Sequence, residues 1–313
     1  MGGYFFVEPM KYEKPALSYT DQVARLRERG MQFQNEARAE HYLGHLNYYR
    51  LAAYWLPYES HHDSHLFRSG TQFETVLDHY LFDRELRLLL LDAIERIEVS
   101  LRGHFAYQLG HRHGPHALMQ SSLFKDSSRW NYRSGLAGLL KYVQGNREVF
   151  IQHFREHYDE PLPPVWAVVE IMSFGQLSKW LQHLAHSDDR NAIARAYGLD
   201  ERILISFCHH LYIVRNHCAH HGRVWNRELA VKFTLPRNPA LLGESLVKGR
   251  DESAQRKLYN TAVMLTYLLD VISGHHHFRE RLAGLIEQYS IHPTSMGFPE
   301  GWQQLPVWMD RLS

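Results

Sequence analysis

Residues 72–111, which read QFETVLDHYLFDRELRLLLLDAIERIEVSLRGHFAYQLGH, contain the longest amphipathic pattern of the chain. Apolar side chains recur here mostly at steps of three and four residues, the spacing of one face of an α-helix. The apolar positions of this face are Phe73, Val76, Leu77, Tyr80, Leu81, Leu88, Leu91, Ile94, Leu101 and Phe105. Gly114 and Pro115 end the pattern. The stretch therefore predicts one long helix that contributes a face to the core of a helical bundle.

The segments before this helix predict a small helical module. One helix should begin with Ser18 or Thr20 as its N-cap and end at Gly30, and a second should run over residues 35–55, up to Pro57. The polar segment at 59–70, ESHHDSHLFRSG, is typical of a linker or surface loop. We therefore expect residues 1–68 to form an N-terminal helical module with its linker.

The segments after the long helix also show helical periodicity. We expect helices near residues 134–144, 147–157, 165–184, 201–221 and 252–289. The chain has no series of alternating strands, no glycine-rich phosphate loop and no internal repeat. The predicted fold class is therefore all-α, with a helical domain over residues 69–290. Apolar residues in the tail, residues 291–313, should pack back on this domain.

Composition and charge exclude several classes of protein. Of 313 residues, 44% are hydrophobic, which is enough for a core, and 35 Lys and Arg against 34 Asp and Glu give a net charge of +1. Nucleic-acid binding would therefore need a local basic patch. No apolar run reaches the length of a membrane span, and Cys208 and Cys218, ten residues apart on one expected helix, cannot bridge each other within it. We expect a cytoplasmic protein that does not enter the membrane.

The stretch YIVRNHCAHHGRVWNR, residues 212–227, concentrates three arginines, three histidines and two asparagines behind an apolar helical stripe. In one interpretation these residues are a solvated helix end. In a second, His217 and His221 are two zinc ligands at helical spacing. However, Cys218 stands where the zincin motif has glutamate, and no firm third ligand is present. We therefore expect no metal ion.

A third interpretation is RNA cleavage without a metal ion. In that reaction the 2′-hydroxyl attacks the neighbouring phosphate, and histidine is suited to the proton transfers near neutral pH. The fork of an arginine side chain suits the phosphate oxygens. His220 can carry out the first role and Arg215 the second. The reaction needs both a general base and a general acid, and one chain supplies only one of them in His220. A two-fold dimer that pairs two copies of this helix end would supply both.

The segment RNHCAH, from Arg215 to His220, matches the Arg-(polar)-x-x-x-His motif of the HEPN superfamily of ribonucleases. With its surroundings the chain resembles the Abi-like (abortive infection, AbiD/AbiF type) family. The resemblance covers about residues 14–302. It rests on the order of KPALSYTDQVARLRERGM, NYYRLAAYW, FDRELRLLLLDAIERIEVSLR, VWAVVEIMSFGQLSKW, RNHCAHHGRVWNR and MGFPEGW.

The resemblance implies a HEPN helical bundle and a bacterial antiphage protein that is an endoribonuclease, forms a homodimer and needs no cofactor. Arg215 and His220 would be the catalytic pair, oriented by Asn216. The supporting or RNA-binding positions that it implies are His221, Arg223, Asn226, Arg227, Glu98, Arg102, Tyr48, Tyr49 and Arg50. Glu98 and Arg102 are equally expected as a structural ion pair, and the two tyrosines as core of the small module. The alternative function is a non-catalytic HEPN protein that binds RNA or regulates a toxin.

Overall fold

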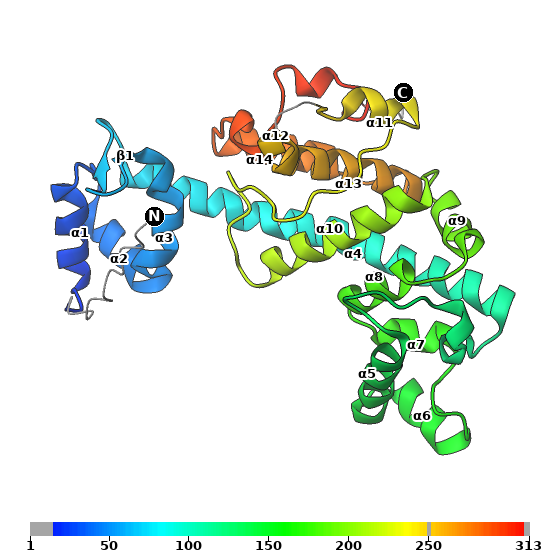
Figure 1. Ribbon diagram of the computed structural model, residues 1–313. Coiled ribbons are helices and arrows are strands. Elements are labelled where there is room, and N and C mark those ends of the chain that lie inside the picture. The colour runs from blue at the N-terminus through cyan, green and yellow to red at the C-terminus, as the bar shows by residue number, and fades with distance from the viewer. Residues whose placement is uncertain (1–14, 249–251, 310–313) are drawn as a thin grey trace, which may run out of the picture. The chain divides into compact units, whose positions relative to one another are not determined.

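The computed structural model describes residues 15–248 and 252–309, and its secondary structure is helical almost throughout (Figure 1). This confirms the all-α prediction. The chain divides into two compact units, Met1–Leu81 and Phe82–Ser313, and the boundary falls inside one long helix. In the described ranges, no helix is both long enough and apolar enough to span a membrane.

Among its described residues, the first unit contains three whole helices, a hairpin and the start of the long helix. Its elements are α1 (Tyr19–Glu28), α2 (Glu36–Leu46), α3 (Tyr48–Trp55), the 3-10 turn η1 (Leu56–Tyr58), β1 (Glu59–His61) and β2 (Leu66–Phe67). The oxygen of Ser18 accepts the Asp21 N–H, so the predicted N-cap of α1 is confirmed. The segment predicted as a linker or loop is instead the short antiparallel hairpin of β1 and β2.

The single helix predicted over residues 35–55 is wrong, because the chain breaks at Asn47. This residue adopts a positive φ of 63° and so interrupts the helical hydrogen bonding. Its side-chain oxygen accepts the N–H of Tyr49 and caps α3. Asparagine tolerates this backbone conformation better than most residues, which explains a break without glycine or proline.

The predicted long helix is confirmed as α4 (Phe73–His113). From Phe82 onward α4 belongs to the second unit, where its apolar face is buried. The elements that follow it are η2 (Ala117–Met119), η3 (Ser121–Leu123), α5 (Tyr132–Gly145), α6 (Val149–His157), α7 (Val165–Ile171), α8 (Phe174–Gln182) and α9 (Ser187–Arg195).

The single helix predicted over residues 165–184 is also wrong. Ser173 separates α7 from α8 and forms a capping box with Gln176, in which each side chain accepts the other residue's backbone N–H. The carbonyls at the end of α7 are bound from α4, where the Arg102 guanidinium donates to the oxygens of Val169, Glu170 and Met172 at 2.6–2.8 Å. The break is thus stabilised on both sides.

The remaining elements of the second unit are α10 (Glu201–Ala219), α11 (Ala240–Ser245), α12 (Glu252–Arg256), α13 (Leu258–Ile272), α14 (Phe278–Gln288), η4 (Pro293–Met296) and η5 (Trp302–Gln304). In Figure 1, α10 crosses α4 and lies next to α13. A hydrogen bond of 2.8 Å from the Thr261 hydroxyl to the Nε2 atom of His210 joins α13 to α10. The helix α10 also packs on α8 and α9.

The one helix predicted over residues 252–289 is wrong, since it is divided into α12, α13 and α14. Asp270, near the end of α13, binds the side chains of His276 and Arg279. The other ring nitrogen of His276 accepts the N–H of Phe278, the first residue of α14. Side-chain bonds to Asp270 therefore fix the turn between the two helices. The tail packs its aromatic rings on Tyr259 of α13, to which Trp308 donates a hydrogen bond at 3.3 Å.

Candidate functional site

The Arg215–His220 motif lies at the carboxyl end of α10, and the backbone around it is fixed by a Schellman motif. The N–H of His221 donates to the carbonyl of Cys218 at 3.1 Å, and the N–H of Gly222 donates to the carbonyl of His217 at 2.7 Å. His220 is the C-cap residue, and its own N–H donates to Asn216 at 2.9 Å. The position of the His220 backbone is thus determined by the helix end.

The residue in the left-handed conformation is His221, with φ 58°, and not the glycine that follows it. Glycine is needed at 222 for space. A Cβ atom there would lie 3.2 Å from both the carbonyl oxygen and the Nδ1 atom of His217. Because backbone faces this position, a side chain at 222 would force the turn to shift.

The three residues of the predicted catalytic set differ in exposure. His220 is exposed, whereas Arg215 and Asn216 are partly buried. With about 100° between successive residues, Asn216 and His220 project from one face of α10, and Arg215 lies about 140° from His220. Within residues 15–248 and 252–309, the Arg215 guanidinium and the His220 ring have no hydrogen-bond or ion-pair partner. Both are therefore open to an outside ligand.

His217 and Cys218 lie between Asn216 and His220 and carry atoms that can bind a metal ion. Burial shifts the pKa of both side chains. Burial, with the nearby Asp83 carboxylate, raises the pKa of the Cys218 thiol to about 12, so it stays protonated at neutral pH. Partial burial and the charge of Arg227 lower the pKa of His217. In the part of the chain that the structure describes, no three His, Cys, Asp or Glu side chains are placed to hold a metal ion.

A buried aspartate of α4 holds the turn that follows the motif. Asp83 has no exposed surface, and its Oδ1 atom accepts the N–H groups of Val224 at 2.9 Å and Trp225 at 2.6 Å. Its Oδ2 atom forms an ion pair with Arg87, one turn further along α4. The carboxylate therefore ties the chain after the motif to the central helix.

Sequence reasoning missed Asp83 and Arg87. Their signal was an acid and a base four residues apart inside an apolar helical stripe, FDRELRLLLL. Such a pair can also be solvent-exposed, and the sequence does not show that two distant backbone N–H groups would use the carboxylate.

The predicted supporting residues after the motif are contiguous with this turn. His221 is exposed, while Arg223, Asn226 and Arg227 are partly buried. Asn226 adopts a positive φ of 47°, and Arg227 donates to the carbonyl of Arg223 at 3.5 Å. The structure thus brings these four residues together with Arg215, Asn216 and His220 at one end of α10.

Glu98 and Arg102, which the sequence also proposed as supporting residues, lie in α4 and are mostly buried. Their side chains form an ion pair and are 13% and 12% exposed. Since the Arg102 guanidinium also binds the last carbonyls of α7, the pair has the structural role that the sequence allowed. It holds the end of α7 on α4.

Tyr48, Tyr49 and Arg50 belong to the other compact unit, at the start of α3. The Tyr48 ring packs edge-on against Trp55, and its hydroxyl accepts a hydrogen bond of 2.8 Å from Arg29. Burial raises the pKa of Tyr48. Tyr49 is 76% exposed and Arg50 is also exposed. Tyr48 is therefore part of the packing of this unit, and its two neighbours face solvent.

Comparison with known proteins identifies one family. The family model described as Abi-like protein matches residues 41–226, which is more than half of the chain and includes the whole of α10. The match ends at Asn226, within the turn that Asp83 holds. No curated protein and no solved structure matches the chain.

Proposed function

The chain belongs to the Abi-like protein family, and from this premise we propose that it is an abortive-infection protein that cleaves RNA without a metal ion. Abortive infection halts an infected cell, and cleavage of cellular RNA in the cytoplasm is a direct route to that end. The site is the end of α10, with His220 and Arg215 as the reacting pair.

The reaction transfers the phosphate within the RNA strand. The 2′-oxygen forms a bond to phosphorus while the bond from phosphorus to the 5′-oxygen breaks. A general base takes the proton of the 2′-hydroxyl, and a general acid gives a proton to the leaving 5′-oxygen. The products are a 2′,3′-cyclic phosphate and a free 5′-hydroxyl. His220 performs one proton transfer, and the His220 of a second copy performs the other.

Arg215 has the second role in this proposal. Its guanidinium is positively charged at all physiological pH values and binds the non-bridging phosphate oxygens, where negative charge develops during attack. Asn216 projects from the same face of α10 as His220 and orients the reacting pair through its amide.

One observation carries the proposal. Hydrogen bonds hold the backbone of the motif in place, while its reactive side chains remain available to a ligand. The Schellman motif and the Asp83 carboxylate hold residues 220–225. Across the described chain, the functional groups of Arg215 and His220 bind no other side chain. A helix end of purely structural use would not need both features.

The test is cleavage of a generic single-stranded RNA in EDTA, followed on denaturing gels. His220→Ala and Arg215→Ala should each lower the rate by about 10²–10⁴-fold. The double variant should be little slower than either single one, because both residues act on one phosphate. The matched controls are His153→Ala on α6 and Arg195→Ala on α9, which remove exposed side chains of the same types.

The nature of the products provides an independent check. A 2′-deoxy substitution at the scissile nucleotide should block cleavage there, and the fragments should carry a cyclic phosphate and a 5′-hydroxyl. Cleavage that persists on the deoxy-substituted strand, or full activity of His220→Ala, would rule out this reaction. A chain that binds RNA but never cleaves it would instead favour the non-catalytic alternative.

A further inference from the structure

A cleft of about 820 Å³ lies in the second unit, along the part of α10 that precedes the motif. It is lined by the segment before α5, by α8, by α10 and by the chain that returns after the motif. Five exposed cations of this lining are Lys125, Arg129, Lys179, Arg202 and Lys232. We call this site the basic cleft.

The positive charge of the basic cleft is not neutralised from within. Arg190, a further cation of the lining, forms two hydrogen bonds with Glu201 at 2.6 and 3.3 Å, so the opposite charges of these two side chains neutralise each other. The other acid of the lining, Asp126, accepts the backbone N–H of Tyr132. Over the described ranges, the charged groups of Lys125, Arg129, Lys179 and Arg202 have no partner. The whole chain carries a net charge of only +1, so this is a local concentration of charge.

Hydrogen bonds and ring stacking hold the backbone of one wall of the basic cleft in a defined conformation. An antiparallel bridge joins Phe124 to Leu184, and the N–H of Lys125 donates to the carbonyl of His183 at 2.8 Å. His183 also bonds the hydroxyl of Ser127 and is stacked by Trp130, with ring centroids 4.3 Å apart. The backbone that carries the cations of this segment is thus held in place before any ligand binds.

The aromatic rings of this wall are already occupied by the protein. One face of Trp130 stacks on His183, and an edge of its ring lies so close to Gly135 that a Cβ atom there would be 2.6 Å away. Trp130 is therefore engaged within the protein, and the lining offers a ligand chiefly its exposed cations, which suit phosphate groups. Recognition of this kind follows the sugar–phosphate backbone and tolerates many base sequences.

The basic cleft and the motif share one face of α10. At about 100° per residue, Arg202, His209, Asn216 and His220 project within about 40° of one another. His209 lines the cleft, and the eleven residues from it to His220 advance about 16 Å along the helix axis at 1.5 Å per residue. A few nucleotides of single strand cover this distance.

We propose that the basic cleft binds the backbone of a single-stranded RNA on its way to His220. The cations of the cleft hold several phosphates to one side of the cleaved bond, and α10 guides the strand from the cleft to the motif. This inference rests on the proposed function and extends it, since it assigns the surface that binds the substrate.

The experiment measures binding apart from cleavage. Full-length His220→Ala protein is titrated into a fluorescently labelled RNA of about 20 nucleotides, and anisotropy gives the affinity over a series of salt concentrations. In this background, Arg129→Ala, Lys179→Ala and Arg202→Ala are combined. The affinity should fall by about tenfold or more, and the slope of log affinity against log salt should become shallower by about 2, at roughly 0.7 per lost phosphate contact.

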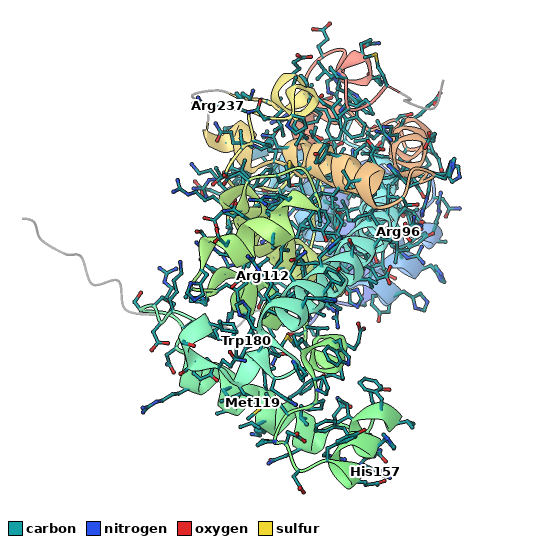
Figure 2. The ribbon with its side chains drawn as sticks, turned by 90° about the vertical axis from the view of Figure 1, so that its right-hand side faces the viewer. Arg96, Arg112, Met119, His157, Trp180 and Arg237 are labelled. Atoms are coloured by element: carbon teal, nitrogen blue, oxygen red, sulfur yellow. The ribbon has the colours of Figure 1, made fainter. Side chains whose placement is uncertain are left out.

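The matched control removes the same charge elsewhere in the second unit, with Arg133→Ala, Lys141→Ala and Arg237→Ala combined in the same background. All three residues are exposed and none lines the cleft. Figure 2 shows Arg237 well apart from Trp180, which belongs to the helix beside the cleft. Circular dichroism melts check that both triple variants fold.

Equal losses in the two triple variants, or none in the cleft variant, would overturn the inference whether or not the parent protein cleaves RNA. A duplex of the same length that binds through the cleft more tightly than the single strand would also overturn it. Loss of binding in the cleft variant alone supports it. Since the assay uses an inactive variant, failure of the cleavage proposal would appear separately, in the EDTA gels.

Discussion

At the residue scale, the buried side chain of His210 should make the stability of the folded protein sensitive to acid. It lies in the middle of α10 and is 2% exposed. Its Nδ1–H donates to the carbonyl of Val231 at 2.6 Å, so its Nε2 atom accepts from the hydroxyl of Thr261 at 2.8 Å. Burial lowers the pKa of His210 to about 4. The neutral ring is therefore part of the core, and a second proton would put a charge there.

We expect the free energy of unfolding to fall as the pH drops from about 6.5 to about 4. In this window the unfolded chain binds a proton at position 210 and the folded chain does not. The loss should be roughly 3 kcal/mol at its limit. Urea denaturation across the pH series measures it. His210→Gln should be less stable at neutral pH but show a flatter profile; an equally steep profile in that variant would assign the acid sensitivity to other groups.

At the scale of secondary-structure elements, the sequence predicted best those helices whose ends are coded locally. The N-cap Ser18 directly precedes the helix that it starts, and the apolar periodicity of α4 runs along that helix itself. The breaks at Asn47 and Ser173 were missed, because apolar periodicity continues across them. At Ser173 the capping-box spacing with Gln176 was visible, but its decisive partner, Arg102, comes from about 70 residues earlier in the chain.

This partner leads to a prediction for the end of α7. Arg102→Ala leaves three carbonyls without a charged donor and the mostly buried Glu98 without its cation. The free energy of unfolding should therefore fall by roughly 3 kcal/mol. Arg96→Ala on the same helix removes an exposed ion pair with Asp92, so it should cost about 1 kcal/mol or less. Chemical denaturation compares the two; equal losses would mean that Arg102 does not hold α7.

At the scale of the whole molecule, the sequence could indicate only the part of the site whose residues are contiguous in the chain. The motif and the turn after it lie within residues 215–227, and the structure keeps them together. The basic cleft escaped prediction because its cations come from four separate segments, between Lys125 and Lys232, in a chain of nearly neutral charge. The packing of α8 on α10 and the bridge from Phe124 to Leu184 bring them together.

The proposed reaction also makes a prediction about assembly. Because one chain supplies one His220, cleavage should depend on a two-fold dimer formed near the end of α10. We expect a dimer at micromolar concentration in sedimentation experiments, and a specific activity that falls on dilution as the dimer dissociates. RNA binding should decline far less, since the basic cleft lies within one chain. A monomer with full specific activity would contradict the shared site.

The bond from Asp83 to the turn after α10 has a consequence for the moment at which this protein becomes active. It joins positions 141 residues apart, and a ribosome adding about 5–20 residues per second needs roughly 7–30 s to make that length. Until Val224 has emerged, nothing anchors the turn. A nascent chain, or a product truncated before this point, should therefore lack the anchored turn and, with it, the proposed cleavage activity.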